Sequence, residues 1–247
     1  MRSETIFALS SGLPPSGIAV VRISGPQAGA ALTALAGSLP EPRRASLRRF
    51  RRADGATLDD GLALWFPGPA TATGEDLAEL HLHGGRAVVA AVLAALGAFP
   101  DCRMAEAGEF TRRAFENGRI DLTEAEGLAG LLAAETELQR RSALALAEGG
   151  MGRLVAAWET TLLRESARLE ALLDFSDEGD VADDLPDTAP LLGLAGEMAA
   201  LLASPPAERM RDGVKVVLGG PPNVGKSSLF NALIDRRGNC DRYCRHN

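Results

Sequence analysis

The residues with the clearest chemical meaning lie near the end of the sequence, in Gly220–Ser227, which reads GPPNVGKS. The stretch matches G-x-x-x-x-G-K-[ST], the pattern of loops that hold nucleotide phosphates. In such loops backbone N–H groups point at phosphate oxygens, while Lys226 reaches the β- and γ-phosphates and Ser227 ligates Mg²⁺. The pattern does not decide between GTP and ATP, and a chance glycine-rich turn is the alternative.

The segments on either side of this loop supply the context that a phosphate loop needs. Before it, VKVVLGG is a short apolar run, typical of a parallel strand buried on both faces. After it, SSLFNALI has the composition of a helix start. We therefore expect the first strand, P-loop and helix of an α/β P-loop domain over residues 213–235.

Residues 1–118 combine short apolar runs with glycine and proline turns, which indicates an α+β domain. Strands are expected over Ile18–Ile23, in GLALWFPGP up to Pro67, and in DLAELHLHGG up to Gly84. The next segment, RAVVAAVLAALGAF, is expected to form a helix with Gly97 near its end.

Residues 119–212 have a helical pattern and form an expected all-α domain. Thr123 and Glu126 fit a capping box at the start of the first helix. The glycines of the segment GGMG, residues 149–152, should weaken the middle of this region.

Two more helices are expected in the same domain. One carries apolar residues on a single face between Val155 and Leu173, and the other runs from Thr188 to about Ala203. The acidic, breaker-rich residues 174–187 between them are a predicted loop.

Composition and charge exclude several classes of protein. The net charge of −7 argues against broad, non-specific binding of nucleic acid, although a local basic patch stays open. The three cysteines, Cys102, Cys240 and Cys244, give no disulfide framework and fit a reducing cytoplasm. No apolar stretch suits a signal peptide or approaches the roughly 20 residues of a membrane span, so no membrane association is expected.

Several long strings occur in a fixed order: VVRISG, LWFPGPATATGEDLAELHLHGG, RMAEAGEFTRRAFENGRIDLTEAEGLAGLLAAET, LLDFSDE and MRDGVKVVLGGPPNVGKSSLFNAL. Within the last string, PNVGKSSLFNAL resembles the loop of the translation-factor-related GTPases. Taken together, the strings resemble the MnmE (TrmE) family of bacterial tRNA modification GTPases. The resemblance covers residues 3–235.

For the phosphate loop, the resemblance implies GTP as the nucleotide. The residues implied in GTP binding are Asn223, Val224, Gly225, Lys226, Ser227 and Ser228. Ser227 would ligate Mg²⁺ and Asn223 would help to hold K⁺. No catalytic residue is assigned in this chain.

For the N-terminal domain, the resemblance implies a folate-binding fold that holds 5-formyl- or 5,10-methylene-tetrahydrofolate through Arg22, Glu79 and Arg119. A guanidinium can clasp the glutamate carboxylate of a folate, and a carboxylate can accept hydrogen bonds from its pterin N–H groups. Position 119 is commonly Lys in the family, so Arg119 keeps the charge and changes the donor geometry. Taken singly, each of the three residues is better explained as a surface or salt-bridge group.

The resemblance also implies partners and an activity. The N-terminal domain would form a homodimer, which would join the flavoprotein MnmG in a heterotetramer. This complex would use GTP hydrolysis to modify carbon 5 of the wobble uridine of tRNA, in the cytoplasm. Two alternatives stay open: a ribosome-assembly GTPase of the Era/Der kind, and a folate-dependent protein resembling aminomethyltransferases.

Two further features have a structural and a functional interpretation. His81 and His83 share one strand face and could bind a metal, although a third ligand is missing and a structural role for His83 is the default. The arginines of PRRASLRRFRR could contact tRNA, whereas a solvated loop or hairpin is the default. These are Arg43, Arg44, Arg48, Arg49, Arg51 and Arg52.

The last segment, residues 236–247, departs from the family pattern. Cys240, Cys244 and His246 invite a zinc interpretation, but a one-base shift of codons permitted by residues 238–247 encodes Ala-Ile-Val-Thr-Asp-Ile-Ala-Gly-Thr. This sequence resembles the family's switch segment, so we expect a frameshifted tail. A chain that ends here would be an N-terminal fragment without the switch and guanine-reading motifs, and we expect it not to hydrolyse GTP.

Overall fold

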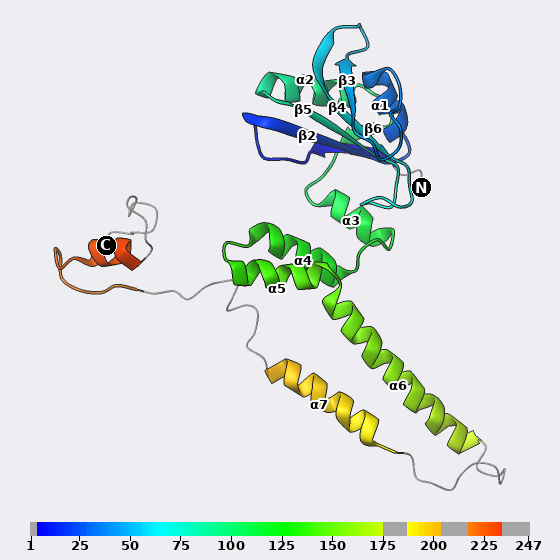
Figure 1. Ribbon diagram of the computed structural model, residues 1–247, viewed down its shortest axis with the longest axis vertical. Helices are drawn as coiled ribbons and strands as arrows, with labels where there is room; N and C mark the ends of the chain where they lie inside the picture. The colour runs from blue at the N-terminus through cyan, green and yellow to red at the C-terminus, as the bar shows by residue number, and fades with distance from the viewer. Residues whose placement is uncertain (1–3, 175–186, 204–216, 234–247) are drawn as a thin grey trace. The chain divides into compact units, whose positions relative to one another are not determined.

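The computed structural model describes residues 4–174, 187–203 and 217–233 of the chain. The chain divides into two compact units, residues 1–184 and residues 185–247, and Figure 1 labels their helices and strands. The first unit contains a β-sheet domain and a run of helices, and the described part of the second contains two helices and the P-loop. These elements confirm the predicted α+β domain and all-α segment, and the loop and helix that begin a P-loop domain.

Six strands form one sheet in the order β3-β4-β5-β2-β1-β6. The strands are β1 (Thr5–Leu9), β2 (Ser16–Ser24), β3 (Ser46–Arg51), β4 (Thr57–Phe66), β5 (Leu77–Gly84) and β6 (Cys102–Met104). All neighbouring strands are antiparallel except β1 and β6, which are parallel. The three strands predicted from the sequence are β2, β4 and β5, and they lie side by side.

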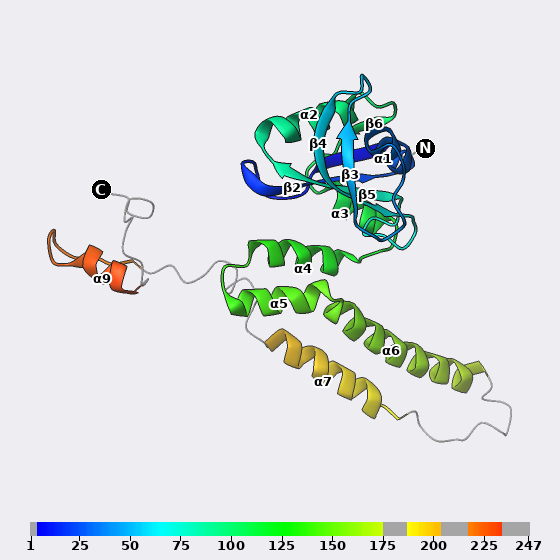
Figure 2. The ribbon, with the colours of Figure 1, turned by 45° about the horizontal axis from the view of Figure 1, so that its top comes forward.

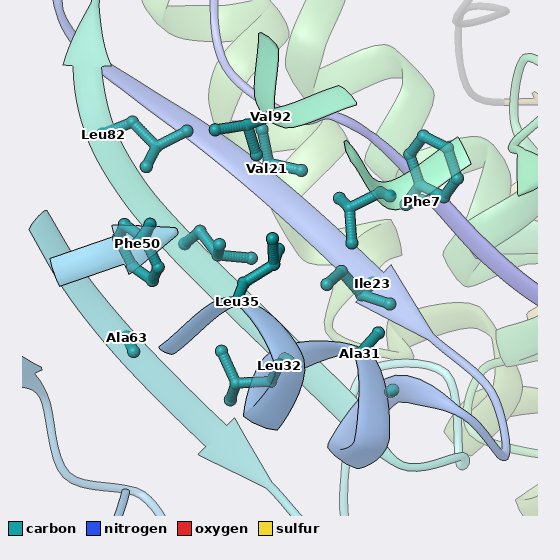
Figure 3. Close-up of a cluster of buried hydrophobic side chains, with 14 of the residues drawn as sticks. Phe7, Val21, Ile23, Ala31, Leu32, Leu35, Phe50, Ala63, Leu82 and Val92 are labelled. Atoms are coloured by element: carbon teal, nitrogen blue, oxygen red, sulfur yellow. The ribbon is translucent and has the colours of Figure 1, made fainter. Parts of the chain in front are cut away.

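The hydrophobic core fills one face of this sheet. Successive strand residues point to opposite faces, so Val21 and Ile23 of β2 and Leu80 of β5 point into the core. Helix α1 (Ala28–Ala36) adds Leu32, and helix α2 (Arg86–Gly97) adds Val92 (Figure 3). The intervening residues of β2 and β5 therefore lie on the other face, which these two helices leave open.

Four helices follow the sheet: α3 (Glu109–Glu116), α4 (Leu122–Ala133), α5 (Glu137–Ala147) and α6 (Gly150–Asp174). Figure 2 shows α4 and α5 lying side by side. The predicted capping box at Thr123 and Glu126 is wrong, because Asp121 accepts from the Glu124 backbone N–H and the Glu124 side chain accepts from the N–H of Asp121. The glycine segment does interrupt the helix, as predicted: α5 ends just before Gly149, which has φ of +74°, and α6 begins just after it.

The second unit contains α7 (Ala189–Ala203), as predicted, and α9 (Lys226–Leu233). Val217 and Leu218, at the end of the predicted strand, are not in a strand, and Val217 is 89% exposed. A buried parallel strand needs neighbouring strands, and the described residues of this unit provide none. Residues 175–186 of the predicted loop, the start of the predicted strand and the predicted frameshifted tail lie outside the described residues.

Candidate functional site

Arg22 and Glu79 meet on the open face of the sheet. They are direct cross-strand partners in the antiparallel pairing of β2 and β5, so their side chains emerge next to each other. The Nε and Nη2 atoms of Arg22 both donate to Oε1 of Glu79, at 3.0 and 2.7 Å. The structure thus brings two of the three expected folate residues into one ion pair.

Two more side chains complete the surroundings of this pair. The ring of Phe110, on α3, lies with its centroid 5.8 Å from the guanidinium carbon of Arg22, a cation–π distance. On β5, His81 places Nε2 at 3.4 Å from Oε2 of Glu79, the oxygen that Arg22 does not use. The Arg22 side chain is 31% exposed and that of Glu79 is 16% exposed, so both are held firmly and remain accessible.

Arg119, the third expected folate residue, lies just after α3 and contacts the loop that precedes β5. Its Nε donates to the carbonyl of Thr71 at 3.1 Å, and Asn117 Nδ2 donates to the carbonyl of Thr73 at 2.7 Å. Gly74 lets the two side chains cross this loop, because a Cβ there would lie 2.8 Å from Cβ of Asn117. Among the described residues, the terminal nitrogens Nη1 and Nη2 of Arg119 make no hydrogen bond, so both are available to bind a ligand.

A buried polar cluster ties this loop to the strand that carries Arg22. Ser24, two residues after Arg22 on β2, has its hydroxyl 2.7 Å from that of Thr73 and donates to Glu75 at 2.9 Å. Glu75 also accepts from Nη1 of Arg113, on α3, at 3.0 Å. The loop that holds Arg119 is therefore tied to β2 at Ser24, which is two residues from Arg22 and shares its face of the strand.

A chain of ion pairs anchors α3 beside this loop. Glu109 is 2% exposed and accepts two hydrogen bonds from Arg103, at 2.7 and 2.8 Å, and one from Arg113 at 3.1 Å. The hydrogen bonds from Arg103, followed by those from the Glu106 backbone N–H and Arg113, lower the pKa of Glu109 from 4.5 to about 2. The carboxylate is therefore charged at neutral pH and holds two guanidinium groups in place.

Replacing Gly74 by Ala should damage the site as well as the fold. Alanine at position 74 would have to adopt φ of +80°, and its Cβ would press on Asn117 and Arg119. We therefore expect the free energy of unfolding to fall by about 2 kcal/mol and folate binding to weaken. Gly55→Ala is the matched control, because its φ is +84° and a Cβ there meets nothing within 4 Å. Urea denaturation and calorimetric titration with 5-formyltetrahydrofolate measure both effects. Equal behaviour of the two variants would contradict the role assigned to Gly74.

Three residues of the P-loop in the second unit have a positive φ. Gly220 and Gly225 have φ of +150° and +86°, and Asn223 has φ of +62°. The backbone N–H of Leu229 donates to the carbonyl of Gly225, so the loop leads directly into α9. Lys226 folds back over the loop, where its Nζ donates to the carbonyls of Gly220 at 2.9 Å and Pro221 at 2.7 Å.

The other residues expected to bind GTP lie in the same loop and at the start of α9. Val224, Ser227 and Ser228 are exposed, and Ser227 and Ser228 lie in the first turn of α9, where free N–H groups and the helix dipole favour anions. The Ser227 hydroxyl and the Asn223 side chain are oxygen donors of the kind that Mg²⁺ and K⁺ take. The donor set thus fits the cations expected from the sequence.

The metal interpretation of His81 and His83 gains no support from the described residues. These contain no group of three His, Cys, Asp or Glu side chains that could hold a metal ion. His83 instead places Nδ1 at 2.8 Å from Asp59, and its backbone N–H donates to the same carboxylate. His83 is therefore tied to the neighbouring strand β4, in agreement with a structural role.

The basic segment forms β3 and its flanks, a hairpin with β4. Arg44, Arg49 and Arg52 pair with the carboxylates of Glu41, Asp60 and Asp54. Arg43 donates to the carbonyl of Ala70. Half of the six positive charges are thus neutralised within the hairpin, which favours the solvated-hairpin interpretation.

Sequence reasoning missed the residues that hold the site together. Glu75, Glu109 and Arg113 were not selected, and neither were Ser24 and Phe110. Four of these five are polar residues at low exposure and the fifth is an aromatic ring, and their positions become visible only once the strands and α3 have been placed. Arg103 and Glu109 do lie six residues apart, but nothing in the sequence shows that Glu109 is buried.

Within the described residues, no helix has both the length and the apolar composition needed to span a bilayer.

Two family models match the chain. The first, described as the N-terminus of the GTP-binding protein TrmE, matches residues 5–119, and the second, described as the MnmE helical domain, matches residues 122–243.

Curated relatives agree with these models. The chain is 63% identical over 244 residues to the tRNA modification GTPase MnmE of Novosphingobium aromaticivorans, an alignment that covers 94% of this chain and 56% of the relative. It is 60% identical over 232 residues to the protein of the same name from Erythrobacter litoralis, with 94% and 55% covered. The chain spans about half the length of the curated relatives it matches.

Proposed function

The chain belongs to the MnmE (TrmE) family of tRNA modification GTPases, and from this premise we propose that its sheet domain binds a one-carbon tetrahydrofolate and its P-loop binds GTP. With the family shown, the Era/Der-like and aminomethyltransferase-like alternatives are set aside. The observation that carries the folate proposal is the partly exposed Arg22–Glu79 pair, together with the loop of residues 71–75, which links Arg119 to β2. Arg119 would clasp the glutamate carboxylate of the folate, and Glu79 would accept pterin N–H groups.

At the P-loop, GTP would lie on the backbone N–H groups of Asn223–Ser228. Lys226 would exchange its two loop carbonyls for phosphate oxygens. Ser227 would ligate Mg²⁺ and Asn223 would support K⁺. Together these ions would offset the negative charge of the phosphates.

The activity of the whole protein is part of the same proposal. The protein would pair with itself through the N-terminal domain and act with the flavoprotein MnmG in the cytoplasm. There it would modify carbon 5 of the wobble uridine of tRNA, with the folate as carbon donor and GTP hydrolysis as the coupled step. The relatives are named tRNA modification GTPase MnmE, which supports this assignment.

Glu79→Gln tests the folate site directly. The substitution keeps the shape of the side chain and removes the charge that strengthens hydrogen bonds from the pterin, so affinity for 5-formyltetrahydrofolate should fall about 10- to 100-fold. Calorimetric titration measures this change. GTP binding, measured on the same variant, should not change, because the P-loop lies in the other unit.

Glu41→Gln is the matched control, since Glu41 also pairs with an arginine but is 65% exposed and lies outside the site. It should bind the folate as the wild type does. A wild-type chain that binds no reduced folate would refute the proposed function, and equal loss in both variants would remove the role of Glu79.

A further inference from the structure

We propose that His81 is a specificity-determining residue of the folate site, which reads the amino group of the pterin ring together with Arg22 and Glu79. The inference rests on the proposed function, since it concerns the same ligand. The two carboxylate oxygens of Glu79 have different partners. Both nitrogens of Arg22 that reach Glu79 bind Oε1, and among the described residues only His81 approaches Oε2.

The three side chains form a row in a fixed order on the sheet face. Arg22 lies at the Oε1 side of the carboxylate, and the imidazole of His81 lies at the Oε2 side with a distance of 3.4 Å. His81 follows Glu79 by two residues on β5, so both point to the open face of the sheet. Its side chain is 31% exposed, which leaves room for a ligand edge.

This row offers a defined sequence of hydrogen-bonding groups. Arg22 carries only donors, and its Nη1 has no partner among the described residues. Glu79 offers Oε2 as an acceptor. A carboxylate oxygen only accepts, so Nε2 of His81 carries the N–H in its 3.4 Å contact with Oε2, and the other ring nitrogen, Nδ1, is the second acceptor of the row.

The pterin ring of a reduced folate carries the complementary groups along one edge. These are a carbonyl oxygen, a ring N–H and an exocyclic amino group, in that order. The carbonyl would accept from Arg22, the ring N–H would donate to Glu79, and the amino group would donate to His81. A ligand without the amino group would leave the His81 acceptor unpaired and would be discriminated against.

The residues beside His81 suit a flat ring. Its cross-strand partners are Leu62 on β4 and Val20 on β2, which share its face of the sheet. Leu62 is 39% exposed and offers apolar surface next to the polar row. The sheet thus presents an apolar floor for the ring and a polar edge for its substituents.

The experiment crosses two variants with two ligands. Calorimetric titration of the 247-residue chain uses 5-formyltetrahydrofolate and its 2-desamino-2-methyl analogue, with wild type, His81→Phe and His81→Gln. His81→Phe should weaken binding of the natural folate about 3- to 10-fold, the effect of one lost hydrogen bond, and should bind the analogue as the wild type does. His81→Gln keeps a donor and an acceptor and should recover most of the lost affinity.

Every result of these titrations either supports or overturns the role of His81. If His81→Phe weakens both ligands equally, or neither, or if His81→Gln is no better than His81→Phe, the proposal is overturned while folate binding by the wild type stands. If the wild type binds no reduced folate, the proposed function fails and this inference fails with it. Thermal melting of both variants shows whether any loss of binding reflects unfolding.

Discussion

Glu109→Gln should destabilise the sheet domain by about 3–5 kcal/mol at neutral pH. Glu109 is 2% exposed and is the common partner of Arg103 and Arg113, so the amide would leave two guanidinium groups with only part of their hydrogen bonds. Urea denaturation followed by the fluorescence of Trp65 measures the change, in a Trp158→Phe background that leaves Trp65 as the only tryptophan.

The effect of Glu109 should depend on pH in a defined direction. The folded pKa of about 2 lies below the ordinary value of 4.5, so the stabilisation is complete above about 4.5 and is lost as the pH falls toward 2. The difference between wild type and variant should therefore shrink in this window. Glu106→Gln is the control, because Glu106 is 70% exposed and should cost less than about 1 kcal/mol. A large effect of Glu106→Gln, or none of Glu109→Gln, would contradict the assignment.

Gly127→Leu should separate α4 from α5, at a cost of about 3 kcal/mol. A Cβ at Gly127 would lie 2.4 Å from the backbone nitrogen of Ala147 and 2.8 Å from the carbonyl carbon of Leu146. The obstacle is backbone, which cannot rotate away as a side chain can. Far-UV circular dichroism during urea denaturation measures the loss of helix.

The matched control is Gly196→Leu, in α7, where a Cβ meets nothing within 4 Å. At position 196 the better helix propensity of Leu should raise the free energy of unfolding by up to about 1 kcal/mol. The two substitutions replace the same residue type in a helix and should change stability in opposite directions. Changes of the same sign would show that α4 and α5 do not pack through Gly127.

The parts of the fold that could be predicted from the sequence are those with local signals. β5 alternates in hydrophobicity, and the other two predicted strands, β2 and β4, are short apolar runs that end at glycine or proline. The predicted helices α2 and α7 are apolar runs bounded by the same residue types. Three other elements, β1, β3 and α1, gave no clear pattern. β1 has only five residues, β3 contains three arginines, and α1 is apolar nearly throughout, so that periodicity cannot identify it.

The same distinction applies to the candidate sites. The P-loop is a continuous stretch, so its glycine positions, Lys226 and the helix that follows could be predicted together. Arg22 and Glu79 are 57 residues apart, and their contact depends on the register of β2 against β5. The family resemblance selected these two residues, but the role of His81 and the support from Phe110 required the strands and α3 to be placed.

The pairing of β1 with β6 has a consequence for the order of events during synthesis. Thr5, near the start of the chain, pairs with Cys102, and Phe7 pairs with Met104. While a ribosome is still making the first hundred or so residues, the outer edge of β1 has no strand to bond to. The nascent domain therefore carries an open edge of unpaired backbone N–H and C=O groups until its last strand emerges, and a chaperone that covers this edge would favour correct closure over aggregation.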